Sequence, residues 1–459
     1  MIATLTPSSV IHSDPSTTFP DADSSASSET GRQQKTLVVI GNGMVGLCFC
    51  EKLITADPDH KFKIVTFCEE PRAAYDRVGL TSFFAHRDAE KLLLAKKGWY
   101  EEHGVELHVG DRAHFIDREQ KVVRSVRGCE VKYDTLVLAT GSFPFVPPVP
   151  GVEKQGVFVY RTIEDLERMI AYAKDAKSCL VIGGSLLGLE VTKAVYDLGL
   201  EVHIVEDNPR LMPRQIDDVA STILVKQIEA MGVHVHLNRG TKEIHGTSQV
   251  EAVEFNDGTQ LEVGMVVIPS GVLPRDELAK QSGLHRGPRG GFAVNDLLQT
   301  SDPNVYAIGE CAAHVGMTFG LVAPGDEMVE TLTSVLTGGG NRFRGSDMST
   351  TLKLIGVDVA SFGQVEIPHD QGVSLTFEDP LHDSYKKLIV SPDGKRLLGG
   401  ILIGDTSEYG TLSILAKTGD PLPCEPHELM IGQIGGEPDR GGVARQSRVL
   451  PFSRESPEN

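Results

Sequence analysis

Cysteine is sparse in this chain and never occurs in a redox or metal-binding motif. The seven cysteines stand at positions 48, 50, 68, 129, 179, 311 and 424, and no C-x-x-C is present. This pattern excludes the disulfide framework of a small secreted protein and the clustered thiols of a zinc site. Most of the cysteines fall within apolar stretches, which is typical of small buried side chains in a reducing compartment. We therefore predict no metal site.

Long apolar runs and an excess of positive charge are also lacking. No stretch approaches the roughly 20 apolar residues of a membrane span, and the net charge is −19. That charge would repel nucleic acid and anionic membranes, so neither is expected as a partner. Residues 1–34 are polar and lack the apolar segment of a secretory signal, and we expect disordered tails over 1–34 and 433–459. Together these features predict a cytoplasmic protein.

From residue 35 onward, short β-branched runs alternate with helical stretches. This alternation predicts parallel sheets with crossover helices, and the cycle starts at TLVVIG (36–41) and again at SCLVIGG (178–184). We therefore predict an α/β fold with two Rossmann-like dinucleotide-binding domains, the second inserted in the first. The expected first domain comprises 35–150 and 270–337, the second 151–269, and a small C-terminal α+β domain 346–432.

The first of the two strands runs into the loop GNGMVG, which carries Gly41, Gly43 and Gly46 in G-x-G-x-x-G spacing. The first glycine permits a tight turn, the second lets backbone N–H groups approach a pyrophosphate, and the third allows close helix packing. The helix that follows directs its positive end at the phosphates. Glu69 and Glu70 end the second strand. One of them is expected to accept the ribose hydroxyls of a dinucleotide, and strand parity leaves open which.

The second loop, GGSLLG, departs from this spacing because Ser185 replaces the middle glycine. Its hydroxymethyl group points toward the expected pyrophosphate and could weaken binding by about 1–3 kcal/mol, or its hydroxyl could donate to a phosphate oxygen. Gly183 and Gly188 remain, and Glu206 ends the next strand as the expected ribose acid. A carboxylate there repels a 2′-phosphate and favours NADH, although Arg210 and Arg214 just downstream could accommodate NADPH.

Later segments complete the pattern and carry a resemblance to a known family. In TSDPNVYAIGECA (300–312), Glu310 follows an apolar strand and is placed to hold a ribityl hydroxyl. The other segments are VIGNGMVG (39–46), FCEEPRAAYDRVGLTSFF (67–84), ATGSFPFVPP (139–148), YRTIEDL (160–166), GVLPRDELA (271–279), FGLVAPG (319–325), LKLIGVDVASFG (352–363) and YKKLIV…LLGGILIGDTSEYGTL (385–412). They resemble the pyridine nucleotide-linked FAD oxidoreductases. More closely, they are similar to the N-terminal flavin and nicotinamide section of the assimilatory NAD(P)H nitrite reductase large subunit.

The resemblance implies that FAD occupies the first domain and NADH or NADPH the second. FAD would be held by Gly41, Gly43, Gly46, Glu69 or Glu70, Arg77, Thr140, Gly141, Gly309 and Glu310. The nicotinamide cofactor would be held by Gly183, Ser185, Gly188 and Glu206, with Glu190 near the nicotinamide. The sequence identifies no catalytic acid or base.

The chain also departs from this family. The nitrite reductase continues with iron–sulfur and sirohaem elements, whereas here only Cys424 lies beyond Cys311 and a cluster needs about four cysteine ligands. We therefore expect no reduction of nitrite to ammonia by this polypeptide alone. The missing dithiol excludes disulfide reduction of the glutathione-reductase type. Asp326 stands in FGLVAPGDEM, where the related reductases tend to carry an aromatic residue. We expect Asp326 to lie on a loop, where it is either part of a changed substrate pocket or an exposed surface residue.

Three functions are compatible with these residues. The leading hypothesis is an FAD-dependent oxidoreductase that takes hydride from NAD(P)H and passes electrons to an organic acceptor, oxygen or a partner protein. The second is an oxidase, dehydrogenase or monooxygenase acting directly on a small molecule in a specialised pathway, for which Ser185 and Asp326 are the motive. The third is a non-catalytic FAD-binding protein whose C-terminal domain docks a partner. The sequence leaves the oligomeric state, including a homodimer, open.

Overall fold

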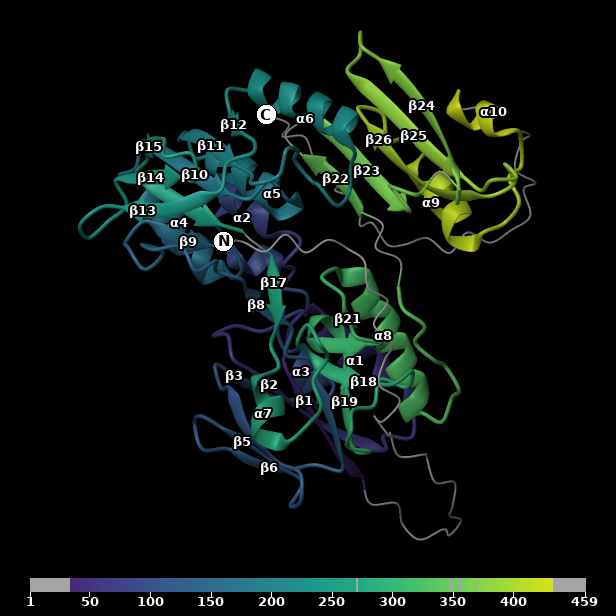
Figure 1. Cartoon of the computed structure of the whole chain (residues 1–459). Helices are drawn as coiled ribbons and strands as arrows, with labels where there is room; N and C mark the ends of the chain where they lie inside the picture. The colour runs from purple at the N-terminus through teal and green to yellow at the C-terminus, as the bar shows by residue number, and fades with distance from the viewer. Residues whose placement is uncertain (1–33, 270, 347–349, 355–356, 369, 432–459) are drawn as a thin grey trace, which may run out of the picture.

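The computed structural model describes residues 34–269, 271–346, 350–354, 357–368 and 370–431. The two tails expected to be disordered lie outside these residues, apart from Gln34 and its hydrogen bonds to the backbone at His60 and Phe62. Figure 1 shows three bodies: a lower one that begins the chain, an upper one on the left, and a C-terminal one on the right. The α/β fold with two Rossmann-like units and a further C-terminal domain is confirmed.

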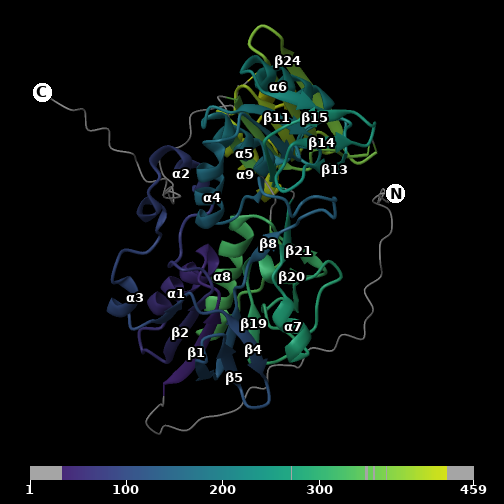
Figure 2. The ribbon, with the colours of Figure 1, turned by 90° about the vertical axis from the view of Figure 1, so that its left-hand side faces the viewer.

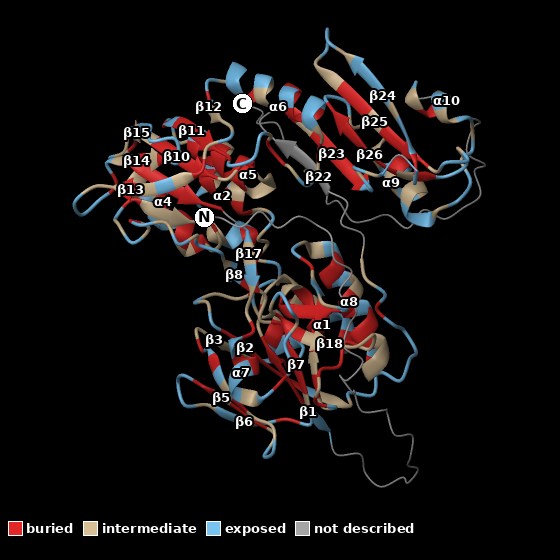
Figure 3. Ribbon diagram, in the orientation of Figure 1, coloured by how far each residue is buried: buried red, intermediate tan, exposed pale blue. Residues whose placement is uncertain are grey.

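The lower body is built on a five-stranded parallel sheet in the order β19-β7-β1-β2-β3. Its elements are β1 (Lys35–Ile40), α1 (Met44–Ala56), β2 (Phe62–Cys68), α3 (Trp99–Glu102), β3 (Glu106–Val109), β7 (Thr135–Leu138), α7 (Glu277–Ser282), β19 (Val305–Ala307), η2 (Gly309–Cys311) and α8 (Val322–Leu336). Small sheets flank it, formed by β4 (Ala113–Asp117), β5 (Val122–Ser125) and β6 (Glu130–Lys132), and by β18 (Phe292–Val294), β20 (Ala312–His314) and β21 (Met317–Thr318). The central strands are buried on both faces because helices and small sheets cover them (Figure 3).

The upper left body repeats the plan with a parallel sheet in the order β12-β11-β10-β16-β9. Its elements are β9 (Val157–Val159), α4 (Ile163–Ala173), β10 (Ser178–Ile182), α5 (Leu186–Tyr196), β11 (Glu201–Val205), α6 (Asp218–Ala230), β12 (His234–His236), β13 (Thr241–His245), β14 (Ala252–Phe255), β15 (Gln260–Glu262) and β16 (Met265–Ile268). Helices cover one face of this sheet, and the β13–β15 sheet packs on the other. The ribbon of β8 (Ser142–Pro144) and β17 (Val272–Pro274) joins the two bodies.

One early segment leaves the lower body. Helix α2 (Leu80–His86) and the short η1 (Ala89–Leu92) precede β3 in sequence, yet α2 packs against α4 and α5 of the upper body. Its buried side chains Leu80, Phe83 and Phe84 belong to the apolar core of that body. Figure 2 shows α2 beside α4, above α1. Helix α2 therefore forms part of the boundary between the two nucleotide lobes.

The C-terminal body is a five-stranded antiparallel sheet with two helices. The strands are β22 (Thr350–Leu354), β23 (Val357–Gly363), β24 (Val373–Asp379), β25 (Ser384–Val390) and β26 (Leu397–Ile403), and the helices are α9 (Tyr409–Thr418) and α10 (Pro426–Met430). The sheet packs on α6 of the second lobe. There Asp217 accepts hydrogen bonds from the Tyr385 hydroxyl at 2.9 Å and from Lys387 Nζ at 3.0 Å.

Candidate functional site

Three pieces of chain that are far apart in sequence meet at one edge of the first sheet. β1, β7 and β19 run parallel, so their carboxyl ends lie together. This places Gly41, the turn at Thr140 and Gly141, and the turn at Gly309 and Glu310 side by side. Ligands of open α/β sheets bind at such an edge.

The first glycine loop is fixed by the protein itself at two of its three glycines. Gly41 has φ +116°, and an added Cβ would lie 2.1 Å from the Ala139 carbonyl oxygen. A Cβ on Gly46 would lie 2.1 Å from the Gly41 carbonyl oxygen. At Gly43, by contrast, a Cβ would meet nothing within 4 Å. The described chain therefore leaves free the space that a pyrophosphate needs, and this loop fits FAD.

Asn42, within the same loop, is a residue that the sequence reasoning missed. Its buried side-chain oxygen accepts hydrogen bonds from the Ala74 amide at 3.0 Å and the Tyr100 hydroxyl at 2.9 Å. Its Nδ2 is buried and has no partner in the described part of the chain. A buried donor without a partner is costly, and a bound cofactor oxygen would satisfy it. Only the general rule that buried polar groups need partners could have singled it out.

The two glutamates after β2 have different partners. Glu69 pairs with Arg275, Nη1 to Oε2 at 2.6 Å. Glu70 pairs with Arg77 and accepts a hydrogen bond from the Tyr75 hydroxyl at 2.7 Å. The choice between them as the ribose acid stays open, since each carboxylate already holds a cation. Arg275 lies in the family-like segment 271–279, but no pattern in the sequence assigns it a role.

Glu310 joins the two lobes. Its Oε2 accepts hydrogen bonds from Ser142 Oγ at 2.7 Å and from Arg161 Nη2 at 2.6 Å. Arg161 follows β9 of the second lobe, and its backbone oxygen accepts from Arg77 Nη1 at 3.0 Å. Thr140 Oγ1 donates to the Arg275 carbonyl at 2.5 Å. The segment around Arg161 is thus held between both cofactor sites, and sequence reasoning assigned it no function.

The second glycine loop has the same backbone as the first. Gly183 has φ +120°, and a Cβ on Gly188 would lie 1.9 Å from the Gly183 carbonyl oxygen. Ser185 has φ −76° and ψ 174°, an extended conformation open to any residue, and it is the N-cap of α5 without a side-chain cap hydrogen bond. The serine therefore causes no backbone strain, and its hydroxyl is available to a ligand.

Glu206 is buried at the end of β11 and is positioned by several donors. Its Oε2 accepts from the Gly184 amide at 2.7 Å, and its Oε1 from the Asn208 amide at 3.0 Å and Asn208 Nδ2 at 2.6 Å. Arg210, one of the two arginines considered for NADPH, instead pairs with Asp218 at 2.9 Å and Glu366 at 2.7 Å. Its guanidinium is engaged with the C-terminal domain, so that expectation is not supported for Arg210.

Glu190 lies on the first turns of α5, half-buried, without a hydrogen bond or ion pair among the described residues. Burial raises the pKa of its carboxyl to about 7. Its charge also raises the pKa of Tyr160, after the larger effect of burial of that hydroxyl. The Tyr160 hydroxyl lies 3.1 Å from Thr81 Oγ1 on α2. Glu190 therefore lies near Tyr160, at the boundary between the lobes.

Two further sequence expectations concern the cysteines and Asp326. All seven cysteines are unpaired, and burial raises the pKa of Cys50 and of Cys68 to about 12, so neither forms a thiolate at neutral pH. Asp326 was expected on a loop, but it lies exposed within α8, which begins at Val322. Pro324 in the first helical turn needs no N–H there, so the segment forms helix.

Two parallel-sheet lobes, each with a glycine loop and a strand-end acid, define a reductase with one site for each of two nucleotide cofactors. The chain belongs to the pyridine nucleotide-disulphide oxidoreductase family, whose model matches residues 35–331. Residues 349–419 match the rubredoxin NAD+ reductase C-terminal domain. These matches confirm the expected class of protein, an FAD-dependent NAD(P)H oxidoreductase similar to the nitrite reductase large subunit.

Proteins with similar sequences and folds also support membership in this family. The NADH nitrite reductase large subunit of Escherichia coli is 46% identical over 402 residues, covering 87% of this chain and 48% of that protein. The assimilatory nitrate reductase electron transfer subunit of Bacillus subtilis is 36% identical, covering 82% of this chain and 48% of that protein. The chain thus spans about half the length of these relatives. The solved putidaredoxin reductase–putidaredoxin complex has the same fold, with TM-score 0.76, 22% identity, and coverage of 87% of this chain and 98% of that chain.

Proposed function

We propose that this chain uses NADH to reduce FAD in the first lobe and passes the electrons to a redox partner protein. The observation that carries the proposal is the doubled glycine loop, together with Arg161 of the second lobe, which bonds to Arg77 and Glu310 of the first lobe. When bound, FAD supplies a ring that accepts a hydride and can release single electrons. The residues of this chain bind the two cofactors and orient them toward each other.

In the first lobe, the amides of the GNGMVG loop would hold the pyrophosphate at the N-terminus of α1. The turns at Thr140, Gly141 and Gly309 would border the rest of the cofactor. The Oε1 atom of Glu310 has no partner among the described residues, since Oε2 takes both Ser142 and Arg161. That oxygen would accept a ribityl hydroxyl. Arg77, together with Glu69 or Glu70, would close the adenosine side.

In the second lobe, Glu206 would accept the adenine ribose hydroxyls. Its carboxylate is held rigidly by Gly184 and Asn208, so it would repel a 2′-phosphate rather than turn aside. This arrangement supports NADH over NADPH. Glu190 would contact the nicotinamide end, and with a pKa near neutrality it would do so in either protonation state.

A partner protein is the acceptor that the relatives support best. One relative is named as an electron transfer subunit, and a neighbour in fold is solved as a complex with putidaredoxin. A small organic acceptor or oxygen is the alternative, and a homodimer in the cytoplasm is the setting we propose. No described helix is both long and apolar enough to cross a bilayer.

Anaerobic mixing of the FAD-loaded protein with each nicotinamide tests the proposal. We expect NADH to bleach the flavin absorbance at a saturable rate and NADPH to do so much more weakly. Reoxidation of the reduced flavin by a small iron–sulfur protein should then outpace reoxidation by oxygen. Failure of both nicotinamides to bleach the flavin would overturn the proposed electron source, and reoxidation by oxygen alone would overturn the proposed acceptor.

A further inference from the structure

Three histidines gather on the second lobe, away from both glycine loops. His203 lies on β11, and His234 and His236 lie on β12, the edge strand of the sheet. The parallel register pairs His203 with His234, so the two imidazoles stand on the same face of the sheet. Their rings stack with centroids 4.7 Å apart. Glu201, two residues before His203 on β11, shares that face because side chains alternate along a strand.

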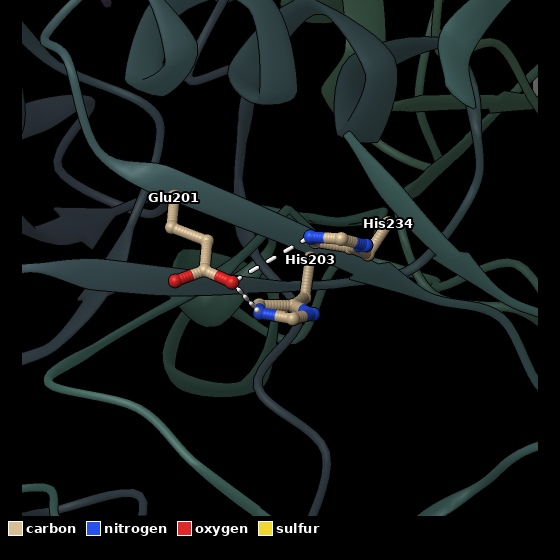
Figure 4. A group of neighbouring side chains, drawn as sticks. All are labelled: Glu201, His203 and His234. Atoms are coloured by element: carbon tan, nitrogen blue, oxygen red, sulfur yellow. Dashed lines mark ion pairs between the residues drawn. The ribbon is translucent and has the colours of Figure 1, made fainter. Parts of the chain in front are cut away.

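The carboxylate of Glu201 lies to one side of the two stacked imidazoles, and one of its oxygens faces a ring nitrogen of each (Figure 4). Its Oε1 is 3.6 Å from His203 Nε2 and 3.5 Å from His234 Nε2. Neither contact is a hydrogen bond, since such bonds are about 2.7–3.2 Å long. Two ligands held at about 2.0–2.1 Å from a tetrahedral zinc ion are about 3.3–3.4 Å apart. These two separations, from the carboxylate to each imidazole, therefore match two edges of a tetrahedral zinc site, and the stacked rings would have to rotate to turn both Nε2 lone pairs onto one ion.

We propose that Glu201, His203 and His234 form a binding site for a divalent transition-metal ion, with Zn²⁺ as the fitting ion. The three ligand atoms lie within 4.8 Å of one another. Two imidazole nitrogens and one carboxylate oxygen are a ligand set that zinc uses in proteins, with the fourth position left to water. Side-chain exposures of 60% for Glu201 and 53% for His234, against 10% for His203, give an ion access from solvent to a buried anchor.

His236 supports this assignment. The Nδ1 atom of His203 lies 3.2 Å from Nε2 of His236, so a proton on Nδ1 leaves the Nε2 of His203 free for the ion. Histidine ligands in metal sites usually donate their second N–H to a partner in this way. The backbone oxygen of His236 also accepts the Glu206 amide at 2.9 Å. An ion bridging β11 and β12 would therefore stabilise the strand pair that positions the ribose acid.

A second cluster with the same residue types provides a matched control. Glu243, His245 and Glu254 lie on the β13–β14 pair. There both carboxylate oxygens of Glu254 already have a partner: Oε2 accepts a hydrogen bond from His245 Nε2 at 3.0 Å, and Oε1 accepts one from Lys242 Nζ at 2.5 Å. The ammonium group of Lys242 would repel a cation. We therefore expect this cluster to bind no metal.

Equilibrium dialysis of the FAD-loaded, chelator-treated full chain against ZnCl₂ tests the site. The unaltered protein and His245→Gln should each bind one Zn²⁺ more tightly than His234→Gln and Glu201→Gln, in which that ion is lost. His236→Phe keeps the ring packing and should weaken binding about 10- to 100-fold, the usual effect of removing a ligand's supporting hydrogen bond. His234 and Glu201 are exposed, so these variants should fold, and near-unchanged melting temperatures without metal would verify that.

Two results would overturn the assignment. One is equal zinc binding by the unaltered protein and His234→Gln, which would place the ion elsewhere or show that none binds. The other is loss of the ion in His245→Gln. Zinc should also raise the melting temperature of the unaltered protein but not of His234→Gln, because only an ion held by the native lobe stabilises it.

Discussion

The two glycine loops of this protein share one backbone and differ in what surrounds it. The amide of Gly41 donates to the Phe67 carbonyl at 2.9 Å, and that of Gly183 to the Val205 carbonyl at 2.8 Å. By this register, Cys68 in the first lobe occupies the place that Glu206 takes in the second. The chain thus repeats the turn itself and changes the residue at the strand end.

A second difference follows from the same alignment. Asn42 occupies the place of Gly184, and its side chain connects the first loop to Tyr100 and Ala74. In the second lobe it is the Gly184 amide that connects to Glu206. Each glycine loop is therefore supported by residues of its own lobe. A substitution that disrupts one loop should leave the other cofactor bound.

The largest effect is expected from substitutions that disrupt one glycine loop at a time. Gly46→Ala and Gly188→Ala each force a Cβ to within 2.1 Å or 1.9 Å of a backbone oxygen, an overpacking that costs about 3 kcal/mol. Gly46→Ala should lose FAD, whereas Gly188→Ala should retain FAD but not be reduced by NADH. Flavin content and anaerobic bleaching measure the two outcomes. Loss of FAD from both variants would contradict independent loops.

Glu206→Gln should have the next largest effect. It removes charge-assisted hydrogen bonds worth about 1.5–3 kcal/mol, so the KM for NADH should rise about 10- to 150-fold at unchanged flavin content. The neighbouring Asp207 is exposed, and Asp207→Asn is the control that removes the same charge. A similar rise in KM for Asp207→Asn would show that general charge, and not the positioned carboxylate, matters.

Gly43→Ser copies Ser185 into the first lobe. The chain itself leaves space for the side chain, so the variant should fold with an unchanged melting temperature when FAD is absent. Binding of FAD should weaken by about 1–3 kcal/mol because the hydroxymethyl group enters the pyrophosphate space. Titration of the FAD-free protein with FAD measures this. Unchanged affinity would mean that the cofactor does not approach Gly43.

Glu190 should make stability depend on pH. Burial raises its pKa from 4.5 to about 7, so the folded state holds a proton that the unfolded state has released between these values. The contribution to stability is full below pH 4.5 and is lost as pH rises through 7. The loss is about 1–3 kcal/mol, since the side chain is only half-buried. Glu190→Gln should flatten the profile of thermal stability between pH 4.5 and about 7. An unchanged slope over this interval would contradict the prediction.

Ser185→Gly should have the smallest effect. The serine causes no strain and its hydroxyl has no cap hydrogen bond, so it can donate to a pyrophosphate seated to accommodate it, whereas FAD is expected to lie against the bare Gly43. Ser185→Gly should therefore alter NADH affinity by less than about 1 kcal/mol, within the range of a lost single hydrogen bond. Stopped-flow bleaching at varied NADH concentrations measures it. A gain in NADH affinity of more than tenfold would show that the serine obstructs the pyrophosphate. That result would favour an enzyme that takes electrons directly from a small molecule.

Much of this site could be predicted from the sequence, and the missing part has a common cause. The glycine loops are local patterns, and the helix expected directly after the first loop is present as Met44–Ala56. Arg161, Ser142 and Arg275 were missed because their roles depend on partners more than a hundred residues away in sequence, as the separation of 168 between Ser142 and Glu310 illustrates. The expectation of no metal site rested on cysteine spacing along the chain, and only strand pairing shows that His234 lies beside His203.

The sequence by itself determined the two nucleotide lobes, since strand, glycine turn and helix follow from neighbouring residues and from hydrophobic period. Only the tertiary structure decided which side chains serve them. Parallel pairing brought the ends of β1, β7 and β19 together, moved α2 to the second lobe, and directed Arg210 to Glu366 and away from a nucleotide. Such choices depend on strand register and on which charges meet at the domain boundary, and neither is encoded within a single stretch of chain.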